Sequence, residues 1–590
     1  MEVYNTSFST MMNRDEFFDI PFFQRNYVWD VSNWDELLKE LLEDKNSHFL
    51  GSCITKVGRL EDGKRRNLII DGQQRITTLS ILLKVCCDIG EKKGDIPAVR
   101  AQDALKRLAK IIGENDDFVL KVRHSIFDRP RFDKIMNGDF DFAKIPTSKI
   151  EGCYKYFYDK LNEQPGKVKR VFDVLNGVSC QMIEIQLSES DDEQCIFDTI
   201  NSAGVRLTSA DIIKNALFQR LKTTTSERDT KRLYETYWLN IFEDDDQSVE
   251  YWNALQTKGR VSRSRIELLF QCVGVIEGIY NPEGNSLDKM ADCYKKHLKD
   301  IQSDAIVTLV KKIATYAELY RNSFGKVGDG AEYDYTDDCQ RLIHILHSCD
   351  ISTFDPLILK MLSDSDGEIT DELKGKLKKL ESYVLRHIIA PRASIKNFNK
   401  ECSMILKGEK TIDQYFEDKE NEINDSQIEE GLRHIRTNSQ GKIILFWLEL
   451  ERRFREARLQ VKKLTYKLDL EHIMPQDWLE NWSTIPVINV DDGTVVNDSE
   501  EKKKIRDSAI WEIGNMTLLN SSLNRAIRNG TLSVKIEGDG RKSGVRKYND
   551  YYCTRDVIER AMVSPGVYHW DEKTIRERTD QITKEFLRIW

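Results

Sequence analysis

The sequence has few prolines and no long apolar run. It contains only 11 prolines in 590 residues and no low-complexity tract, so long linkers between domains are not expected. No apolar run reaches the roughly 18 residues that span a bilayer. The first residues show no basic-then-apolar signal pattern. These absences predict a cytoplasmic protein that has no membrane partner.

The spacing of the cysteines also argues against a structural zinc site. All 12 are scattered, and no two of them form a C-x-x-C pair. Cys86 and Cys87 are adjacent, a spacing that suits neither a zinc knuckle nor an ordinary disulfide. We therefore expect reduced thiols that pack in hydrophobic cores, and no structural zinc.

Length and charge limit the architecture. At 590 residues the chain is too long for one core, and its formal net charge of −9 excludes a surface covered by basic residues. A local basic patch would still be enough to contact phosphates. The apolar pattern predicts a helix-rich α+β protein of three domains, over 1–221, 222–440 and 441–590. The helical middle is expected to be a scaffold, or to bind a partner or DNA through basic stretches such as 258–265.

The first domain shows the clearest local patterns. "HFLGSCITKV" and "RRNLIIDG" predict two strands, "ITTLSILLKVCCDIG" predicts a buried helix that ends near Gly90, and "CQMIEIQL" predicts another strand. Ser32 and Asp35 have the spacing of a helix-capping box. Residues 191–218 read as helix, turn and helix, with Thr208 or Ser209 capping the second helix.

A run of polar residues lies where one of these strands meets a helix. "NLIIDGQQRITTL" places Asp71, Gln73, Gln74 and Arg75 at the junction. A strand that ends in Gly and leads into a helix directs free backbone N–H groups toward an anion, and the guanidinium of Arg75 suits phosphate. The chain has no G-x-x-x-x-G-K-[ST] motif, so this is not a P-loop. The alternative is an internal Asp71–Arg75 salt bridge that closes a turn.

Near the C-terminus, "DLEHIMPQ" and "IGNMTLLNSSLN" suggest metal-assisted cleavage of a phosphodiester. The imidazole of His472 is suited to take a proton from water near pH 7, and Glu471, Asp469 and Asn524 offer the oxygen ligands that a hard cation prefers. Neighbours in a strand face opposite sides, so either the strand ends at His472 or Asp469 shares the metal with Glu471. The alternative is a buried histidine with capping asparagines.

A basic run follows these motifs. It predicts a local surface for a nucleic-acid backbone, or else an ordinary solvated face. The basic residues predicted to bind DNA are Arg525, Arg528, Lys535, Arg541 and Lys542.

The C-terminal pattern resembles the HNH nucleases, which have the ββα-metal fold. The residues that carry the resemblance are Glu471, His472, Ile473, Pro475, Asn515 and Asn524. The resemblance implies that His472 is the general base, that Asn524 and Glu471 are ligands of Mg²⁺ or Mn²⁺, and that Asn515 orients the loop or the histidine. Asp469 is the further candidate ligand.

The N-terminal pattern resembles the GmrSD-type modification-dependent restriction enzymes. The segments that carry it are "IPFFQRNYVW", "HFLGSCI", "DGQQR" with "ITTL", and "IFDTINSAGVRLTSADIIKN". The same domain pair occurs in SspE-like and BrxU-like phage-defence proteins. The resemblance implies a ParB/sulfiredoxin-like fold that binds and hydrolyses a nucleoside triphosphate. The implied nucleotide site consists of Asp71, Gly72, Gln73, Gln74 and Arg75, with Gln24, Arg25 and His48 beside it. Asn201, Asp211, Lys214 and Asn215 either contact the ligand or tie the second helix to the sheet.

These patterns together predict an NTP-regulated, metal-dependent DNA endonuclease of phage defence that restricts modified DNA. Two alternatives remain open at this point. One is a nucleotide- and DNA-sensing protein with a vestigial nuclease, and the other is an RNA-cleaving effector. The DNA modification, the preferred NTP and the choice between monomer and homodimer are not encoded in any motif.

Overall fold

The computed structural model describes most of the chain and divides it into two compact units. The residues outside the description are 59, 62–63, 113–116, 189–190, 192–206, 259–260, 392–397, 417–422, 457–461, 524–528, 541–542 and 549. The first unit comprises Met1–Ala254, Ser264–Glu267 and Asp288–Ala314. The second comprises Leu255–Arg263, Leu268–Leu287 and Thr315–Trp590. The helical middle is thus shared between the two units, and the three-domain division stays a prediction.

A mixed sheet forms the centre of the first unit. Its strand order is β1 (Glu2–Ser7), β9 (Cys180–Leu187), β3 (His48–Lys56), β5 (Lys64–Asp71), β2 (Glu16–Asp19) and β8 (Val122–Arg123), with β4 (Leu60–Glu61) paired to β5. The β1–β9 and β3–β5 pairs are antiparallel, and the β9–β3, β5–β2 and β2–β8 pairs are parallel. The strands predicted from apolar patterns are confirmed, and Ile54 of β3 lies opposite Asp71 of β5.

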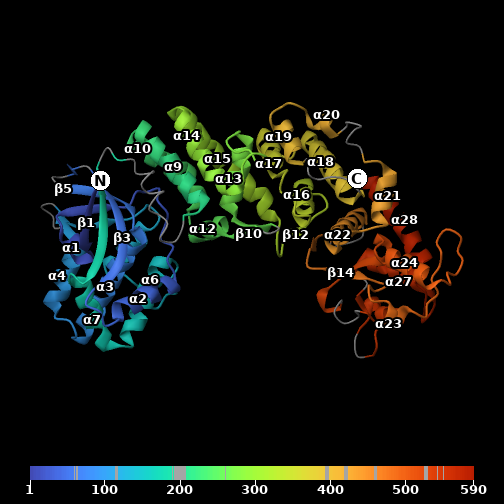
Figure 1. Cartoon of the computed structure of the whole chain (residues 1–590), viewed down its shortest axis with the longest axis horizontal. Coiled ribbons are helices and arrows are strands. Elements are labelled where there is room, and N and C mark those ends of the chain that lie inside the picture. Colours follow the sequence, from blue (N-terminus) through green and yellow to red (C-terminus); the bar gives the residue numbers. More distant parts are fainter. Residues whose placement is uncertain are drawn as a thin grey trace. The chain divides into compact units, whose positions relative to one another are not determined.

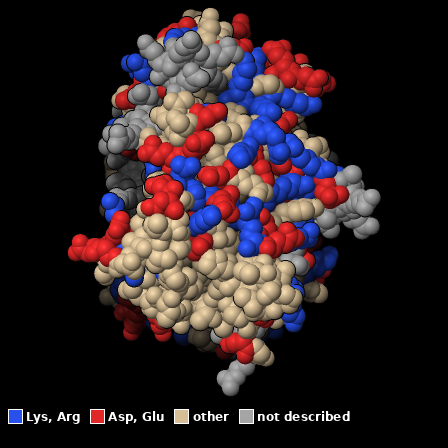
Figure 2. Space-filling view, turned by 90° about the vertical axis from the view of Figure 1, so that its right-hand side faces the viewer, with Lys and Arg blue, Asp and Glu red and all other residues tan. Residues whose placement is uncertain are grey.

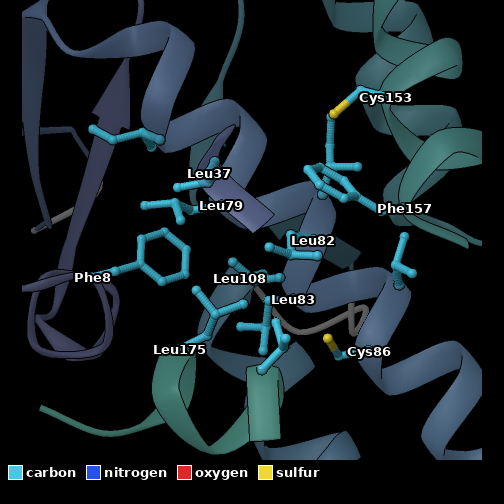
Figure 3. Packing of buried hydrophobic residues seen from close by; sticks show 14 of the residues in the cluster. Phe8, Leu37, Leu79, Leu82, Leu83, Cys86, Leu108, Cys153, Phe157 and Leu175 are labelled. Atoms are coloured by element: carbon cyan, nitrogen blue, oxygen red, sulfur yellow. The ribbon is translucent and has the colours of Figure 1, made fainter. Parts of the chain in front are cut away.

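Helices pack against one face of this sheet (Figure 1). They are α1 (Phe8–Asn13), α2 (Val31–Leu42), α3 (Gln73–Lys93), α4 (Ala98–Leu108), α5 (Arg129–Met136), α6 (Lys149–Asn162) and α7 (Pro165–Asn176). The long α3 packs against α4, α6 and α7. Figure 3 shows its leucines, Leu79, Leu82 and Leu83, among side chains such as Phe8 and Phe157. Burial of this apolar surface fixes the position of the β5–α3 junction. A short hairpin, β6 (Ala109–Ile112) with β7 (Asp117–Leu120), follows α4.

Two predicted helix ends are wrong. The carboxylate of Asp30 accepts from the backbone N–H of Ser32, and the side chain of Asn33 accepts from the backbone N–H of Asp30, so Asp30 rather than Ser32 caps α2. Helix α3 continues past Gly90 and ends at Gly94, whose φ of 74° lies in the left-handed region that favours glycine.

The rest of the first unit is helical. Its elements include α9 (Ser209–Thr224), α10 (Glu227–Tyr234), the π-helical turn η1 (Glu235–Leu239), α11 (Asn240–Phe242), α12 (Asp246–Asn253) and α14 (Met290–Asp300). Thr208, one of the two residues predicted to cap this helix, is the N-cap of α9. Asp211 completes a capping box with it. The helix expected before the turn lies outside the described residues.

The middle region is helical, as predicted. Its helices include α13 (Arg265–Ile276), α15 (Ser303–Ser323), α16 (Asp338–Ser348), α17 (Asp355–Asp364), α18 (Asp371–Ile389), α19 (Phe398–Leu406), α20 (Ile412–Phe416), α21 (Asp425–Leu432) and α22 (Asn438–Arg455). The described residues of the basic stretch 258–265 lie in a strand pair, β10 (Leu255–Lys258) with β11 (Val261–Ser264), and at the start of α13. In the described part of the chain, no helix has both the length and the apolar character needed to cross a membrane.

The second unit ends in the region that carries the HNH-like motifs. Strands β14 (Asp469–His472) and β15 (Met516–Leu519) pair antiparallel, and His472 lies opposite Met516. The helices around them are α23 (Leu479–Trp482), α24 (Ser499–Ile510), α26 (Leu532–Glu537), α27 (Tyr552–Ala561) and α28 (Glu572–Ile589). Helix α22 packs against both strands, and its Phe446 and Trp447 share a core with Met516 and Phe586.

Candidate functional site

His472 ends β14 with its imidazole held in one orientation. Its Nδ1 lies 3.0 Å from the carbonyl oxygen of Ile510 at the end of α24. Because a carbonyl oxygen only accepts, Nδ1 carries the proton and Nε2 carries the lone pair of the neutral ring. Burial lowers the pKa of His472, which outweighs the opposing hydrogen bond to Ile510. The ring is therefore neutral at pH 7, the state that a general base needs.

The side chain of Asn515 makes four hydrogen bonds close to this histidine. Its Oδ1 accepts from the backbone N–H of Met474 at 2.8 Å and from the indole of Trp570 at 3.1 Å. Its Nδ2 donates to the carbonyl oxygens of Met474 at 2.9 Å and Ile510 at 3.1 Å. Asn515 and His472 thus share the Ile510 carbonyl. The fully buried amide positions the loop after β14, and its contacts are all within the protein.

Two amide side chains that are not among the predicted site residues approach the base nitrogen. Oδ1 of Asn438 lies 3.2 Å from Nε2 of His472, and Nε2 of Gln476 lies 3.4 Å from the same atom. Asn438 is exposed and is the first residue of α22, 34 residues before the histidine in the chain. Gln476 belongs to the "DLEHIMPQ" motif, but no sequence signal marks Asn438.

Glu471 faces a different neighbour from His472. Nζ of Lys535 on α26 donates to Oε1 of Glu471 at 2.5 Å and to the carbonyl oxygen of His472 at 2.7 Å. The lysine is completely buried. The expectation that Lys535 lies on an exposed basic surface is therefore wrong, because its ammonium is used inside the fold. Burial lowers the pKa of Lys535 and raises the pKa of Glu471, and their mutual attraction opposes both shifts.

Two of the three residues predicted to bind a hard cation, Glu471 and Asp469, lie within the described part of the chain. Glu471 and His472 are the last two residues of β14, so the strand ends at His472, which was one of the two predicted alternatives. Asp469 is half-buried at the start of the strand. Asn524 lies outside the described residues. Within the described ranges, no three His, Cys, Asp or Glu side chains are grouped closely enough to hold a metal. The carboxylate of Glu471 already holds a cation, the ammonium of Lys535, so the chemistry of this donor fits a metal ion.

Only part of the predicted DNA-contacting run lies within the described residues. Arg525, Arg528, Arg541 and Lys542 lie outside the described residues, and their role stays a prediction. Arg546 at the end of the run is exposed and pairs with Glu537 at 2.5 Å. On the face seen in Figure 2, Lys and Arg side chains gather in a band beside acidic side chains. Positive and negative charges are therefore interspersed on that face.

The β5–α3 junction has the geometry of an anion-binding helix start. Gly72 is the N-cap of α3, with a φ of 91° and, among the described groups, no side chain that caps the helix. A Cβ at Gly72 would lie 2.7 Å from the Cβ of Cys53, so a glycine is needed here. The uncapped backbone N–H groups of the first turn are free to bind an anion.

The two glutamines after Gly72 hold a neighbouring loop. Nε2 of Gln73 donates to the carbonyl oxygen of Arg25 at 3.0 Å. The amide of Gln74 donates to the carbonyl oxygen of Asn26 at 3.1 Å and accepts from the backbone N–H of Val28 at 2.8 Å. Gln74 thus holds the loop at Asn26 and Val28 against the start of α3. Oε1 of Gln73 is buried and has no hydrogen-bond partner among the described atoms.

Arg75 turns back toward β3. Its Nη1 donates to the carbonyl oxygen of Ser52 at 2.9 Å, and its guanidinium lies against Gly51. Burial lowers the pKa of Arg75, while Asp71 acts in the opposite direction. The hydrogen bond of Arg75 thus goes to the backbone of β3, whereas Asp71 acts on the guanidinium through its charge, so the salt bridge considered as an alternative stays a prediction.

The three flanking residues behave differently from one another. Nε2 of Gln24 donates to the carbonyl oxygen of Ile69 at 2.9 Å, and its buried Oε1 has no partner in the described part of the chain. Arg25 approaches Asp211 of α9 at 3.9 Å. His48 is fully buried and contacts Glu40 of α2 at 3.3 Å, and none of the described contacts joins it to the junction.

Helix α9 is tied to the loop that carries Gln24. Nζ of the buried Lys214 contacts the carbonyl oxygen of Gln24 at 3.4 Å and Glu243 at 2.7 Å. Glu243 also accepts from Tyr234 and Trp238. The tying role expected for this element is therefore present. Asn201 lies outside the described residues.

Three buried amide oxygens of the first unit have no hydrogen-bond partner within the described part of the chain. They belong to Gln24, Gln73 and Asn215. Buried acceptors left unpaired are costly, and they are satisfied when a donor-bearing ligand or a hydrated cation binds. Gln73 begins α3, and Gln24 hydrogen-bonds to Ile69 and Ile70 of β5, so the oxygens of these two side chains lie near the uncapped helix start, a set of groups that fits a ligand with N–H groups and phosphates.

Comparison with known families agrees with both motif sets. Residues 8–218 match a family model described as GmrSD restriction endonuclease, N-terminal domain. Residues 412–585 match one described as GmrSD restriction endonucleases, C-terminal domain. The two matches together cover more than half of the chain, and each contains one of the candidate sites. No curated protein matches the chain.

Proposed function

The chain belongs to the GmrSD restriction endonuclease family, and we propose that it is an NTP-regulated, metal-dependent DNA endonuclease of the HNH type. In this proposal it serves in phage defence and cuts modified DNA. The observation that carries the nuclease assignment is His472, whose Nδ1 is fixed on Ile510 so that Nε2 keeps its lone pair. The structural support is thus a general base held in the required tautomer.

The described residues suggest how cleavage would proceed. Nε2 of His472 takes a proton from water, and the resulting hydroxide attacks the phosphorus while the bond to the 3′ or 5′ oxygen breaks and that oxygen takes a proton from solvent water. Asn515 keeps the loop after β14 in place through Met474. When bound by Glu471, Asp469 and Asn524, Mg²⁺ or Mn²⁺ would supply charge stabilisation for the phosphate and the leaving oxygen. Proton removal from water and support of the loop are thus assigned to His472 and Asn515.

The first unit would bind the nucleotide at the β5–α3 junction. The uncapped N–H groups of α3 and the guanidinium of Arg75 suit the phosphates, and the oxygens of Gln24, Gln73 and Asn215 suit donors on the base or ribose. Lys214 links the Gln24 loop to α9, which offers a physical route from nucleotide binding to the helical region.

The proposal is tested by separating the two activities. His472→Ala is expected to abolish DNA cleavage and to leave NTP turnover intact, whereas Arg75→Ala is expected to impair NTP turnover. His434→Ala and Arg65→Ala are the matched controls, because both side chains are exposed and outside the sites. Modified phage DNA, unmodified DNA and RNA are incubated with Mg²⁺ and each NTP. Normal cleavage by His472→Ala would refute the HNH assignment.

The substrate comparison decides between the alternatives. Cleavage of RNA but not DNA would assign the chain to RNA-cleaving effectors. Binding of modified DNA without any metal-dependent cleavage, by a protein that turns over NTP, would indicate a sensing protein with a vestigial nuclease.

A further inference from the structure

The contact between Lys535 and Glu471 has a consequence for metal binding. Lys535 is completely buried, and its two hydrogen-bond acceptors are a carboxylate oxygen of Glu471 and the main-chain oxygen of His472. Carboxylate and main-chain carbonyl oxygens are also the ligands that hard divalent cations take in proteins. The ammonium therefore sits on oxygens that a metal ion would use.

A contribution to stability alone is a weak explanation for the buried Lys535–Glu471 pair. Burying two charges costs solvation that their attraction repays incompletely, so apolar residues of similar size are often as stabilising. The chain nevertheless places both charges at the end of the strand that carries the proposed base. Lysine is also the more movable of the two basic side chains, since its charge is a compact group on a flexible four-carbon stem. Such a group can leave its partner when a stronger cation arrives.

We propose that Lys535 is a built-in competitor of the divalent metal, holding the carboxylate of Glu471 until the metal displaces it. The ammonium neutralises Glu471 in the metal-free protein and keeps the end of β14 in position. When the metal binds Glu471, repulsion between the two cations drives Nζ away from the carboxylate. Lys535 is thus a positioning residue that sets the metal affinity of the site, and the inference relies on the proposed nuclease for the metal itself.

The first test uses the wild-type full chain. The amine of Lys535 is labelled by reductive methylation with and without Mn²⁺, and its modification is read by peptide mass spectrometry. Without metal, labelling should be much slower than at Lys503, which is exposed on α24. With saturating Mn²⁺, labelling of Lys535 should rise while that of Lys503 stays constant. Unchanged protection of Lys535 in the presence of Mn²⁺ would overturn the proposal.

The second test removes the ammonium. Lys535→Met keeps an unbranched side chain of similar length and leaves Glu471 without its cation. Calorimetric titration of the full chain with Mn²⁺ should show affinity raised by about tenfold or more, since a neighbouring charge shifts a carboxylate equilibrium by at least about one log unit. Lys503→Met makes the same change of charge on the surface and should bind Mn²⁺ as the wild type does. An unchanged or weaker affinity in a folded Lys535→Met protein would contradict the proposal.

A third variant separates this inference from the nuclease assignment. In His472→Ala, cleavage should be lost while Mn²⁺ still increases the labelling of Lys535. If the wild-type chain cuts no DNA but its Lys535 responds to Mn²⁺, the competition stands and the nuclease assignment fails. If the chain cuts DNA with Mn²⁺ and Lys535 does not respond, the nuclease assignment stands and the competition fails.

Discussion

Nδ1 of His472 donates a hydrogen bond to the carbonyl oxygen of Ile510 at 3.0 Å, and this contact sets the chemistry of the ring. The proton is held on the nitrogen that faces the protein, so the lone pair lies on Nε2. Asn515 donates to the same carbonyl oxygen at 3.1 Å. One backbone oxygen at the end of α24 therefore orients both the proposed base and the amide that supports its loop.

Asn438 should affect cleavage although it lies outside the motif. Its Oδ1 is 3.2 Å from Nε2 of His472, in position to accept a hydrogen bond from Nε2–H once the base has taken a proton from water. Asn438→Ala should lower kcat about ten- to hundredfold, the range for losing a hydrogen bond to a charged group. Steady-state nicking of supercoiled plasmid measures this effect. Ser439→Ala, the next exposed position of α22, should keep wild-type kcat, and equal effects of the two substitutions would count against the role of Asn438.

Asn515 should matter for stability as well as cleavage. Replacement by Ala leaves the N–H and carbonyl of Met474 and the indole of Trp570 buried without this partner. We expect the free energy of unfolding to fall by about 3 kcal/mol or more, since each of the three unsatisfied buried groups costs about 1–3 kcal/mol. Urea unfolding of the full chain, followed by tryptophan fluorescence, measures the loss. A folded Asn515→Ala chain of wild-type stability and activity would show that the loop holds without this amide.

The contrast between these residues shows where sequence reasoning succeeds. The strands over 48–56, 64–71 and 180–187 were predictable, because apolar periodicity and flanking turn residues are local signals. His472 and Asn515 were recognisable from their spacing. Asn438 was not, because its contact depends on how α22 packs against β14. Lys535 was misplaced for the same reason: a lysine in a basic run is normally exposed, and only the tertiary fold buries it against Glu471.

The N-terminal site illustrates the same limit. The polar junction after β5 was predictable as a candidate ligand site from the order strand, glycine, helix. The use of Gln74 as a clamp on the loop at Asn26 and Val28 was not, because its partners lie 46 and 48 residues away in the chain. Unpaired oxygens such as that of Gln24 are likewise visible only in the folded structure.

Gly51 offers a way to move Arg75 without replacing it. A Cβ at Gly51 would lie 3.0–3.2 Å from the guanidinium of Arg75, and the φ of 90° adds backbone strain. Gly51→Ala should therefore displace Arg75 and lower NTP turnover, with a rise in KM for the nucleotide. Gly138→Ala is the matched control, because its φ is 85° but nothing lies within 4 Å of the added Cβ. If both variants lose NTP turnover equally, backbone strain rather than Arg75 explains the effect.

Asp128 makes the first unit sensitive to pH. Its buried carboxyl accepts from the backbone N–H of Tyr27 at 2.7 Å, and burial raises the pKa of Asp128 to about 7. An aspartate in the unfolded chain loses its proton near pH 4. Between these values the folded protein binds more protons than the unfolded chain, so the free energy of unfolding falls as the pH rises through this window.

Asp128→Asn should remove that dependence, because the amide has no proton to lose and its oxygen still accepts from Tyr27. Between pH 5 and pH 8 the wild type should lose about 2–3 kcal/mol of stability from this group, at about 1.4 kcal/mol per pH unit. The variant should therefore melt above the wild type at pH 8 and close to it at pH 5, as measured by scanning calorimetry of the full chain. Asp103→Asn makes the same change of charge at an exposed position of α4 and should keep the wild-type dependence. A wild-type slope in Asp128→Asn would show that another group controls the loss of stability.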